Sequence, residues 1–141
     1  MKFSWKNPLA HFMLGKIALG IPDLLGDTYY PNADYKEAIS HQEKAIKLGL
    51  LKAALRSSFA HAQALDDLGL SYWYLGDYDK SVGYYLELIR LYPERSFWPR
   101  FLVAEHYFER ADKPAEALEI LKPAPDLEQA GSDYNKQRLY R

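Results

Sequence analysis

The side chains most capable of chemistry in this sequence are its histidines and one pair of adjacent carboxylates. The four histidines are His11, His41, His61 and His106. None of them belongs to an H-E-x-x-H pair, the helical spacing that holds a catalytic zinc ion. Asp66 and Asp67 are neighbours in a helical pattern, and their side chains therefore point about 100° apart around the helix axis. We do not expect these two carboxylates to share a proton as an acid–base pair.

Other reaction classes lack the residues they need. The chain has no Cys, which excludes a thiol nucleophile, a disulfide and the usual structural zinc site. It contains neither the G-x-x-x-x-G-K-[ST] phosphate loop nor the G-x-S-x-G turn that presents a nucleophilic serine. We therefore assign no catalytic residue, metal or cofactor, and we expect a protein that is not an enzyme.

Composition and charge favour a soluble domain that does not bind nucleic acid. The 141 residues match one domain by length, and 18 basic against 19 acidic side chains give a formal net charge of −1. Because the two kinds of charge nearly balance, we expect no positive electrostatic field that would attract nucleic acid or an anionic membrane. No stretch approaches the ~20 apolar residues of a membrane span. His11 and Lys16 interrupt the apolar run that follows the basic start, so we expect a cytoplasmic protein without an export signal.

The elements that would position these side chains are clearest between Leu65 and Pro93, in the stretch LDDLGLSYWYLGDYDKSVGYYLELIRLYP. Apolar residues recur at spacings of three and four in two runs, which predicts two amphipathic helices. Their stripes are Leu65, Leu68 and Tyr72, and then Val82, Tyr85, Leu86 and Ile89. Gly76 ends the first helix and Asp77 caps the second. Pro93 cannot continue the second helix, so the unit is a helical hairpin.

This hairpin resembles a tetratricopeptide repeat, whose pattern is W-x2-L-G-x2-Y…A-x3-F…P over about 34 residues. The matching positions are Leu65 for Trp, then Leu68, Gly69 and Tyr72 in step, Ser81 for Ala, Tyr85 for Phe, and the closing Pro93. The resemblance implies an all-α fold, a right-handed superhelical array of about three antiparallel hairpins. It also implies that the chain works by holding another protein.

The first hairpin is expected over residues 8–49. Asn7 and Pro8 begin a helix that runs to Leu19, and Asp34 caps a second helix of about residues 35–48 that ends at Gly49. Residues 21–33 have two interpretations. Leu25, Gly26 and Tyr29 would make them a short repeat helix. We favour the alternative, a loop inserted in a Sel1-like repeat, because Pro22 and Pro31 leave room for only a short helix.

The rest of the chain is expected to form the central repeat, a degenerate terminal repeat and a tail. The helix before the central repeat is either unusually long or broken at Ser57 and Ser58, and the break is favoured. These parts cover residues 58–93, 96–122 and 123–141 of a single domain spanning 1–141. In the terminal repeat, Ser96 caps a helix that ends near Arg110, and Ala117 and Leu121 belong to the second helix. The tail either caps Leu118 and Leu121 through Leu127, Tyr134, Leu139 and Tyr140 or docks on a neighbouring subunit.

The resemblance also implies a binding surface, because partners of this family usually contact the first helix of each repeat. The corresponding residues here are Phe12, Met13 and Lys16, then Gln63, Asp66, Asp67, Leu70, Trp73 and Tyr74, then Leu102, Val103, His106, Glu109 and Arg110. Such a groove is apolar and aromatic, with an acidic patch at Asp66 and Asp67. The alternative for Trp73 and Tyr74 is packing in the core.

The charge of this predicted groove limits its partner. Chaperone-binding members of the family hold a C-terminal carboxylate with Lys, Arg and Asn, and the two acids here disfavour that ligand. We expect instead a helix or extended segment of another protein with apolar anchors and some basic residues. The alternative is a structural subunit that is permanently assembled into a larger complex or a homo-oligomer.

Overall fold

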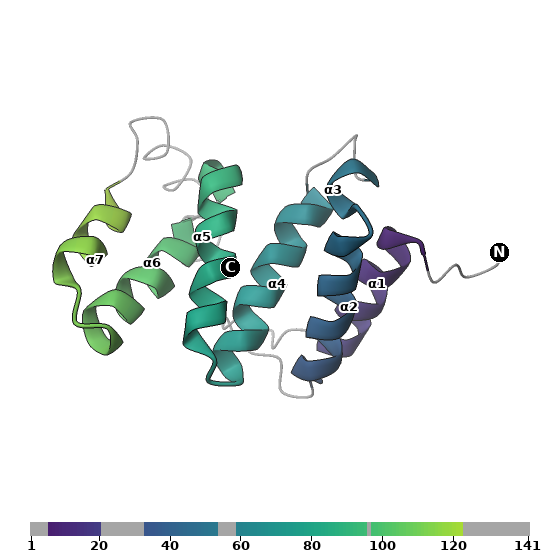
Figure 1. The fold of residues 1–141 in the computed structure, drawn as a ribbon, viewed down its shortest axis with the longest axis horizontal. Helices are drawn as coiled ribbons and strands as arrows, with labels where there is room; N and C mark the ends of the chain where they lie inside the picture. The colour runs from purple at the N-terminus through teal and green to yellow at the C-terminus, as the bar shows by residue number, and fades with distance from the viewer. Residues whose placement is uncertain (1–5, 21–32, 54–58, 96, 123–141) are drawn as a thin grey trace, which may run out of the picture. The chain divides into compact units, whose positions relative to one another are not determined.

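The computed structural model describes residues 6–20, 33–53, 59–95 and 97–122, and within these ranges every element is a helix (Figure 1). The elements are α1 (Pro8–Leu19), α2 (Tyr35–Lys47), α3 (Leu50–Ala53), α4 (Phe59–Tyr74), α5 (Tyr78–Leu91), the 3-10 turn η1 (Pro93–Arg95), α6 (Phe97–Glu105), the π-helix η2 (His106–Arg110) and α7 (Pro114–Leu121). The chain folds into two compact units, Met1–Asp77 and Tyr78–Arg141.

Local capping explains where the first two long helices begin. The side chain of Asn7 accepts hydrogen bonds from the backbone N–H of Leu9 at 2.9 Å and of Ala10 at 3.3 Å, so α1 starts at Pro8. Asp34 Oδ1 accepts from the N–H of Glu37 at 3.0 Å and starts α2 in the same way. Each cap satisfies backbone donors that lack a partner within the helix. Both predicted caps are confirmed.

The first unit is built from α1, α2 and α4, with α2 in contact with both of the others (Figure 1). The backbone N–H of Asp34 donates to the carbonyl of Ala18 at 2.9 Å, which places the start of α2 beside the end of α1. The two helices therefore form an antiparallel hairpin. The two interpretations of residues 21–33 both remain predictions, because residues 21–32 lie outside the described residues.

A core cluster joins the helices of the first unit. It consists of Phe12, Ala45, Leu50 and Ala64, which come from α1, α2, α3 and α4. The short helix α3 thus contributes to the same core, on the N-terminal side of the expected break at Ser57 and Ser58. That break also lies outside the described residues.

In the second unit α6 contacts both α5 and α7. Gly76 has φ of 83° and precedes α5, which begins at Tyr78 and ends at Leu91 before Pro93, as predicted. The next helix continues through η2 to Arg110, where it was expected to end. The widened π-turn at its end was not predicted. The expected cap Ser96 is not among the described residues.

Candidate functional site

A buried polar network occupies the place where the sequence predicted an acidic patch. The side chain of Asp67 on α4 is only 3% exposed. Lys16 Nζ on α1 lies 3.0 Å from its Oδ2 and 3.3 Å from its Oδ1. Gln63 Nε2 donates to Oδ1 at 3.0 Å, and Gln42 Nε2 on α2 donates to Oδ2 at 3.3 Å. The carboxylate therefore links the three long helices of the first unit.

Burial and hydrogen bonding act on Asp67 in opposite directions. Burial raises the pKa of this carboxyl, because loss of water disfavours its charged form, while attraction to Lys16 and the bonds from Gln63 and Lys16 work against the rise. Burial is the larger influence. Because its charge is paired inside the unit, Asp67 is a structural residue here, and only the half-buried Asp66 remains of the predicted acidic patch toward solvent.

The remaining predicted residues of the first unit divide into core and surface. Phe12 and Leu70 are buried, whereas Met13 is exposed. Trp73 is half-buried and Tyr74 is exposed at the end of α4. The ring of Tyr74 stacks on that of Tyr35 from α2, with the ring centroids 5.3 Å apart. This end of the unit thus presents an ordered aromatic pair.

The predicted residues of the second unit divide in the same way. Val103 is fully buried, and Leu102 is half-buried. His106 is also buried, with Nε2 3.7 Å from Asp79 Oδ1 on α5. Glu109 and Arg110 are exposed. These polar residues lie on η2, and π-turns of this kind recur at functional sites.

Arg110 has an aromatic partner in the same unit. The centre of its guanidinium group lies 4.1 Å from the centroid of the Tyr78 ring, a distance that permits a cation–π interaction. The contact joins the last turn of η2 to the first residue of α5. It gives the exposed Arg110 side chain a defined position at the surface.

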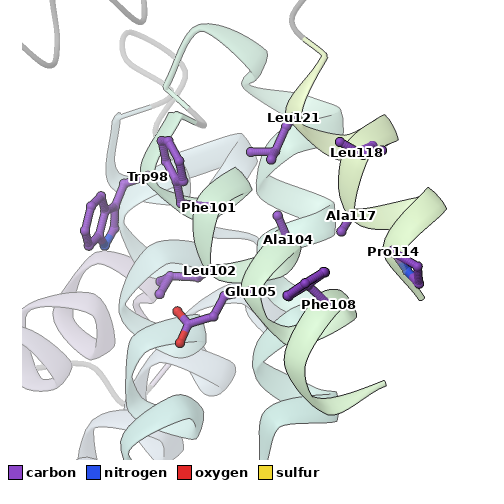
Figure 2. Close-up of a pocket in the computed structure, with 10 residues that line it drawn as sticks. All are labelled: Trp98, Phe101, Leu102, Ala104, Glu105, Phe108, Pro114, Ala117, Leu118 and Leu121. Atoms are coloured by element: carbon purple, nitrogen blue, oxygen red, sulfur yellow. The ribbon is translucent and has the colours of Figure 1, made fainter. Parts of the chain in front are cut away.

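An apolar pocket in the second unit was not among the predicted binding residues, apart from Leu102. Its volume is about 530 Å³, and it is lined from α6, η2 and α7 (Figure 2). The lining consists of Trp98, Phe101, Leu102, Ala104, Glu105, Phe108, Pro114, Ala117, Leu118 and Leu121. We call this set the α6–α7 pocket. The sequence signal was the apolar pair Leu118 and Leu121 on the last helix, which was expected to lack a neighbour.

Two histidines of the first unit contact each other across its helices. His11 Nδ1 and His41 Nδ1 lie 3.1 Å apart and join α1 to α2. Within the described ranges, no group of three or more His, Cys, Asp or Glu side chains is arranged to hold a metal ion. Among the helices that the structure describes, none is both long enough and apolar enough to span a membrane.

Comparison with known proteins identifies the family. A family profile described as tetratricopeptide repeat matches residues 18–94, more than half of the 141-residue chain. The chain belongs to the tetratricopeptide repeat family. The α4–α5 segment that carries the repeat pattern lies inside the matched range.

A solved structure agrees with this assignment. The structure titled "Crystal structure of MamA" matches with a TM-score of 0.64 and 21% sequence identity, over 93% of this chain and 64% of the MamA chain. At that identity the likeness shows the fold, an all-helical array of hairpins. The present chain spans less than two thirds of the length of MamA. A search of curated protein sequences found no match.

Proposed function

We propose that this tetratricopeptide repeat protein is a non-catalytic scaffold that binds a segment of another protein. The family supplies the general role, since stacked helical repeats present extended surfaces to protein partners. The observation that carries the specific proposal is the stacked pair Tyr35 and Tyr74, in which Tyr74 follows the half-buried Trp73 on α4. Aromatic side chains held by rigid helices bury a large area at low entropic cost, and they dominate many protein interfaces.

The predicted site residues take different parts in this proposal according to their burial. The exposed or half-buried ones offer direct contacts: Met13, Lys16, Gln63, Asp66, Trp73, Tyr74, Leu102, Glu109 and Arg110. The buried ones belong to the interior of their own unit and would support the exposed ones there: Phe12, Asp67 and Leu70 in the first unit, and Val103 and His106 in the second. The balanced charge of the chain supports a protein partner rather than nucleic acid. The partner is a helix or an extended segment that offers apolar or aromatic anchors, with some basic residues opposite Asp66.

A paired-variant capture experiment tests this proposal. The full-length protein is used as bait with Tyr74→Ala or with the matched control Phe59→Ala, which removes an exposed aromatic ring from the other end of the same helix. We expect Tyr74→Ala to lose the specific partners that the unchanged protein and the control retain, with unchanged helical circular dichroism. Equal capture by both variants would contradict the assignment of the Tyr35–Tyr74 surface.

A specific observation also supports the second candidate, a permanently assembled subunit. Leu9, Met13 and Ile17 recur at a spacing of four on α1 and are 42%, 55% and 70% exposed. An apolar stripe of this kind is typical of a surface that a stable neighbour covers. Light scattering coupled to size-exclusion chromatography tests self-assembly directly. Dissociation of an oligomer by Ile17→Glu, but not by Lys47→Glu, would favour this candidate, and a stable monomer would exclude the homo-oligomer.

A further inference from the structure

The α6–α7 pocket is an exposed apolar feature of the second unit, and Leu102 is its only lining residue that the proposed function uses. Phe108 is 65% exposed and Leu118 is 66% exposed, although both are large apolar side chains. Figure 2 shows Phe101, Ala104 and Phe108 on the helix that faces Ala117 and Leu121 of α7. In an array of helical repeats, an apolar surface on the last hairpin is normally covered by a capping element with a polar outer face.

The sequence that follows α7 begins at the edge of this pocket. Leu121 lines the pocket and is the last residue of α7, and Lys122 is the last described residue. Pro123 and Pro125 come next, and proline cannot continue the helix. The backbone of Lys122 is already extended, with φ of −76° and ψ of 105°, so the chain leaves the axis of α7 directly after Leu121.

The reach of the following residues is sufficient. The eight residues of α7 span about 12 Å at 1.5 Å per residue. Residues 123–141 provide more than that length whether they are helical or extended, because an extended chain covers about 3.3 Å per residue. Residues 123–141 are therefore long enough to contact any part of the pocket.

The segment also has suitable chemistry. Between residues 126 and 141 its large apolar side chains are Leu127, Tyr134, Leu139 and Tyr140, and its other residues are mainly polar. Every residue that lines the pocket is apolar except Glu105. Lys136 and Arg138 carry the charge opposite to that of Glu105. The apolar groups would fill the pocket while Lys136 or Arg138 pairs with Glu105.

We propose that residues 126–141 bind in the α6–α7 pocket of the same chain. Covalent attachment favours this segment over a second copy of the protein as the occupant of the pocket. A short linker gives an attached segment an effective concentration in the millimolar range, well above that of a separate molecule at micromolar concentration. The attached segment therefore occupies the pocket first, and a partner has to displace it.

Engineered disulfides test this proposal in the full chain, which contains no cysteine of its own. Leu118→Cys is combined in turn with Leu127→Cys, Tyr134→Cys and Leu139→Cys, and cross-linking by a mild oxidant is followed by mass spectrometry at low micromolar concentration. The matched control is Ala115→Cys with the same partners, because Ala115 is exposed on α7 but does not line the pocket. The two positions differ by three residues in tether length, which changes loop closure little.

We expect at least one Leu118→Cys pair to form an intramolecular disulfide about tenfold faster than its control. Equal rates for the two series would overturn the proposal, since they indicate an undocked tail. Preferential formation of disulfide-linked dimers would also overturn it, in favour of a second copy or a docking motif for a neighbouring subunit.

A second experiment leaves the pocket residues unchanged, so that a structural disturbance by the introduced cysteines cannot affect its result. Replacing Leu127 and Tyr134 by serine should lower the melting temperature and increase the binding of an apolar dye by the full chain. Replacing Gln129 and Gln137 by serine should change neither. Identical behaviour of the two double variants would contradict docking of the tail on the pocket.

Discussion

Lys16 Nζ lies 3.0 Å from Asp67 Oδ2, although 51 residues separate the two in sequence. The contact joins the first helix of the chain to the helix that carries the repeat pattern. Gln42 adds the helix between them by donating both to Asp67 and to the backbone carbonyl of Phe12. A pair that the family resemblance placed in the binding groove therefore also organises the interior of the first unit.

Replacing Lys16 by Met should destabilise the first unit. The substitution leaves a carboxylate that is 3% exposed without its cation, and loss of one partner of a buried pair costs ~3–5 kcal/mol. Lys16 itself is 29% exposed, so we expect a smaller loss of about 2–3 kcal/mol. Urea unfolding measures it. The control is Lys47→Met, because Lys47 is exposed, and its free energy of unfolding should stay within about 0.5 kcal/mol of that of the unchanged protein.

The same network predicts a pH dependence. The pKa of Asp67 is raised by burial, so the folded state holds the proton more tightly than the unfolded chain, whose Asp pKa is about 3.9. The folded state binds more protons between the unfolded and the raised folded pKa, and stability falls as the pH rises through this window. The contribution of Asp67 is thus largest below the unfolded pKa and is lost above the folded one.

The difference between the unchanged protein and Asp67→Asn isolates this contribution. We expect the free energy of unfolding of the unchanged protein, relative to the variant, to decrease from about pH 4 upward and then level off. Chemical unfolding at a series of pH values provides the measurement. A relative stability that increases with pH would show that Lys16 outweighs burial.

A side chain at residue 15 should disturb the network through Gln42. A Cβ atom on Gly15 would lie 2.6 Å from Gln42 Nε2 and 2.8 Å from its Cγ, closer than packed atoms approach. Gln42 is fully buried and hydrogen-bonded, so it has little room to move. We expect Gly15→Ala to cost about 1–3 kcal/mol despite the better helix propensity of Ala.

Gly83→Ala is the matched control for this substitution. Gly83 lies within α5, and an added Cβ there meets no atom within 4 Å. Helix propensity alone then applies, and the change should stabilise the protein by about 0.5–1 kcal/mol. Thermal unfolding of both variants compares them directly. If Gly15→Ala were stabilising to the same degree, the close packing of α1 on Gln42 would be wrong.

Tyr72 should contribute to stability through its hydroxyl group as well as its ring. Its O–H donates to Glu43 Oε1 at 2.5 Å and so connects α4 to α2. Hydrogen bonds to charged groups are worth ~1.5–3 kcal/mol, and both side chains here are half-buried. We expect Tyr72→Phe to lose about 1–2 kcal/mol in chemical unfolding. In a Glu43→Gln background the loss should be smaller, and an equal loss would indicate that the charge of Glu43 plays no part.

Much of the fold could be predicted because its signals are local. Asn7 and Asp34 cap helices through bonds to residues within three positions, and Gly76 allows a left-handed turn that ends α4. Apolar spacing along the chain then assigns each helix its buried face, as at Leu65 and Leu68. The family pattern also predicts how successive helices pair. Its small residues stand where neighbouring helices approach closely, and its large residues fill the space between them.

The sequence by itself determined these helices and the repeat family, since caps, breaks and periodicity act within a few residues. Only the tertiary structure decided what Asp67 does, because its environment is made by Lys16 and Gln42 from other helices. The same holds for the α6–α7 pocket, which exists only because two helices together line it and leave Phe108 and Leu118 exposed. Burial and charge pairing depend on distance in space, and that distance is not a property of any single segment.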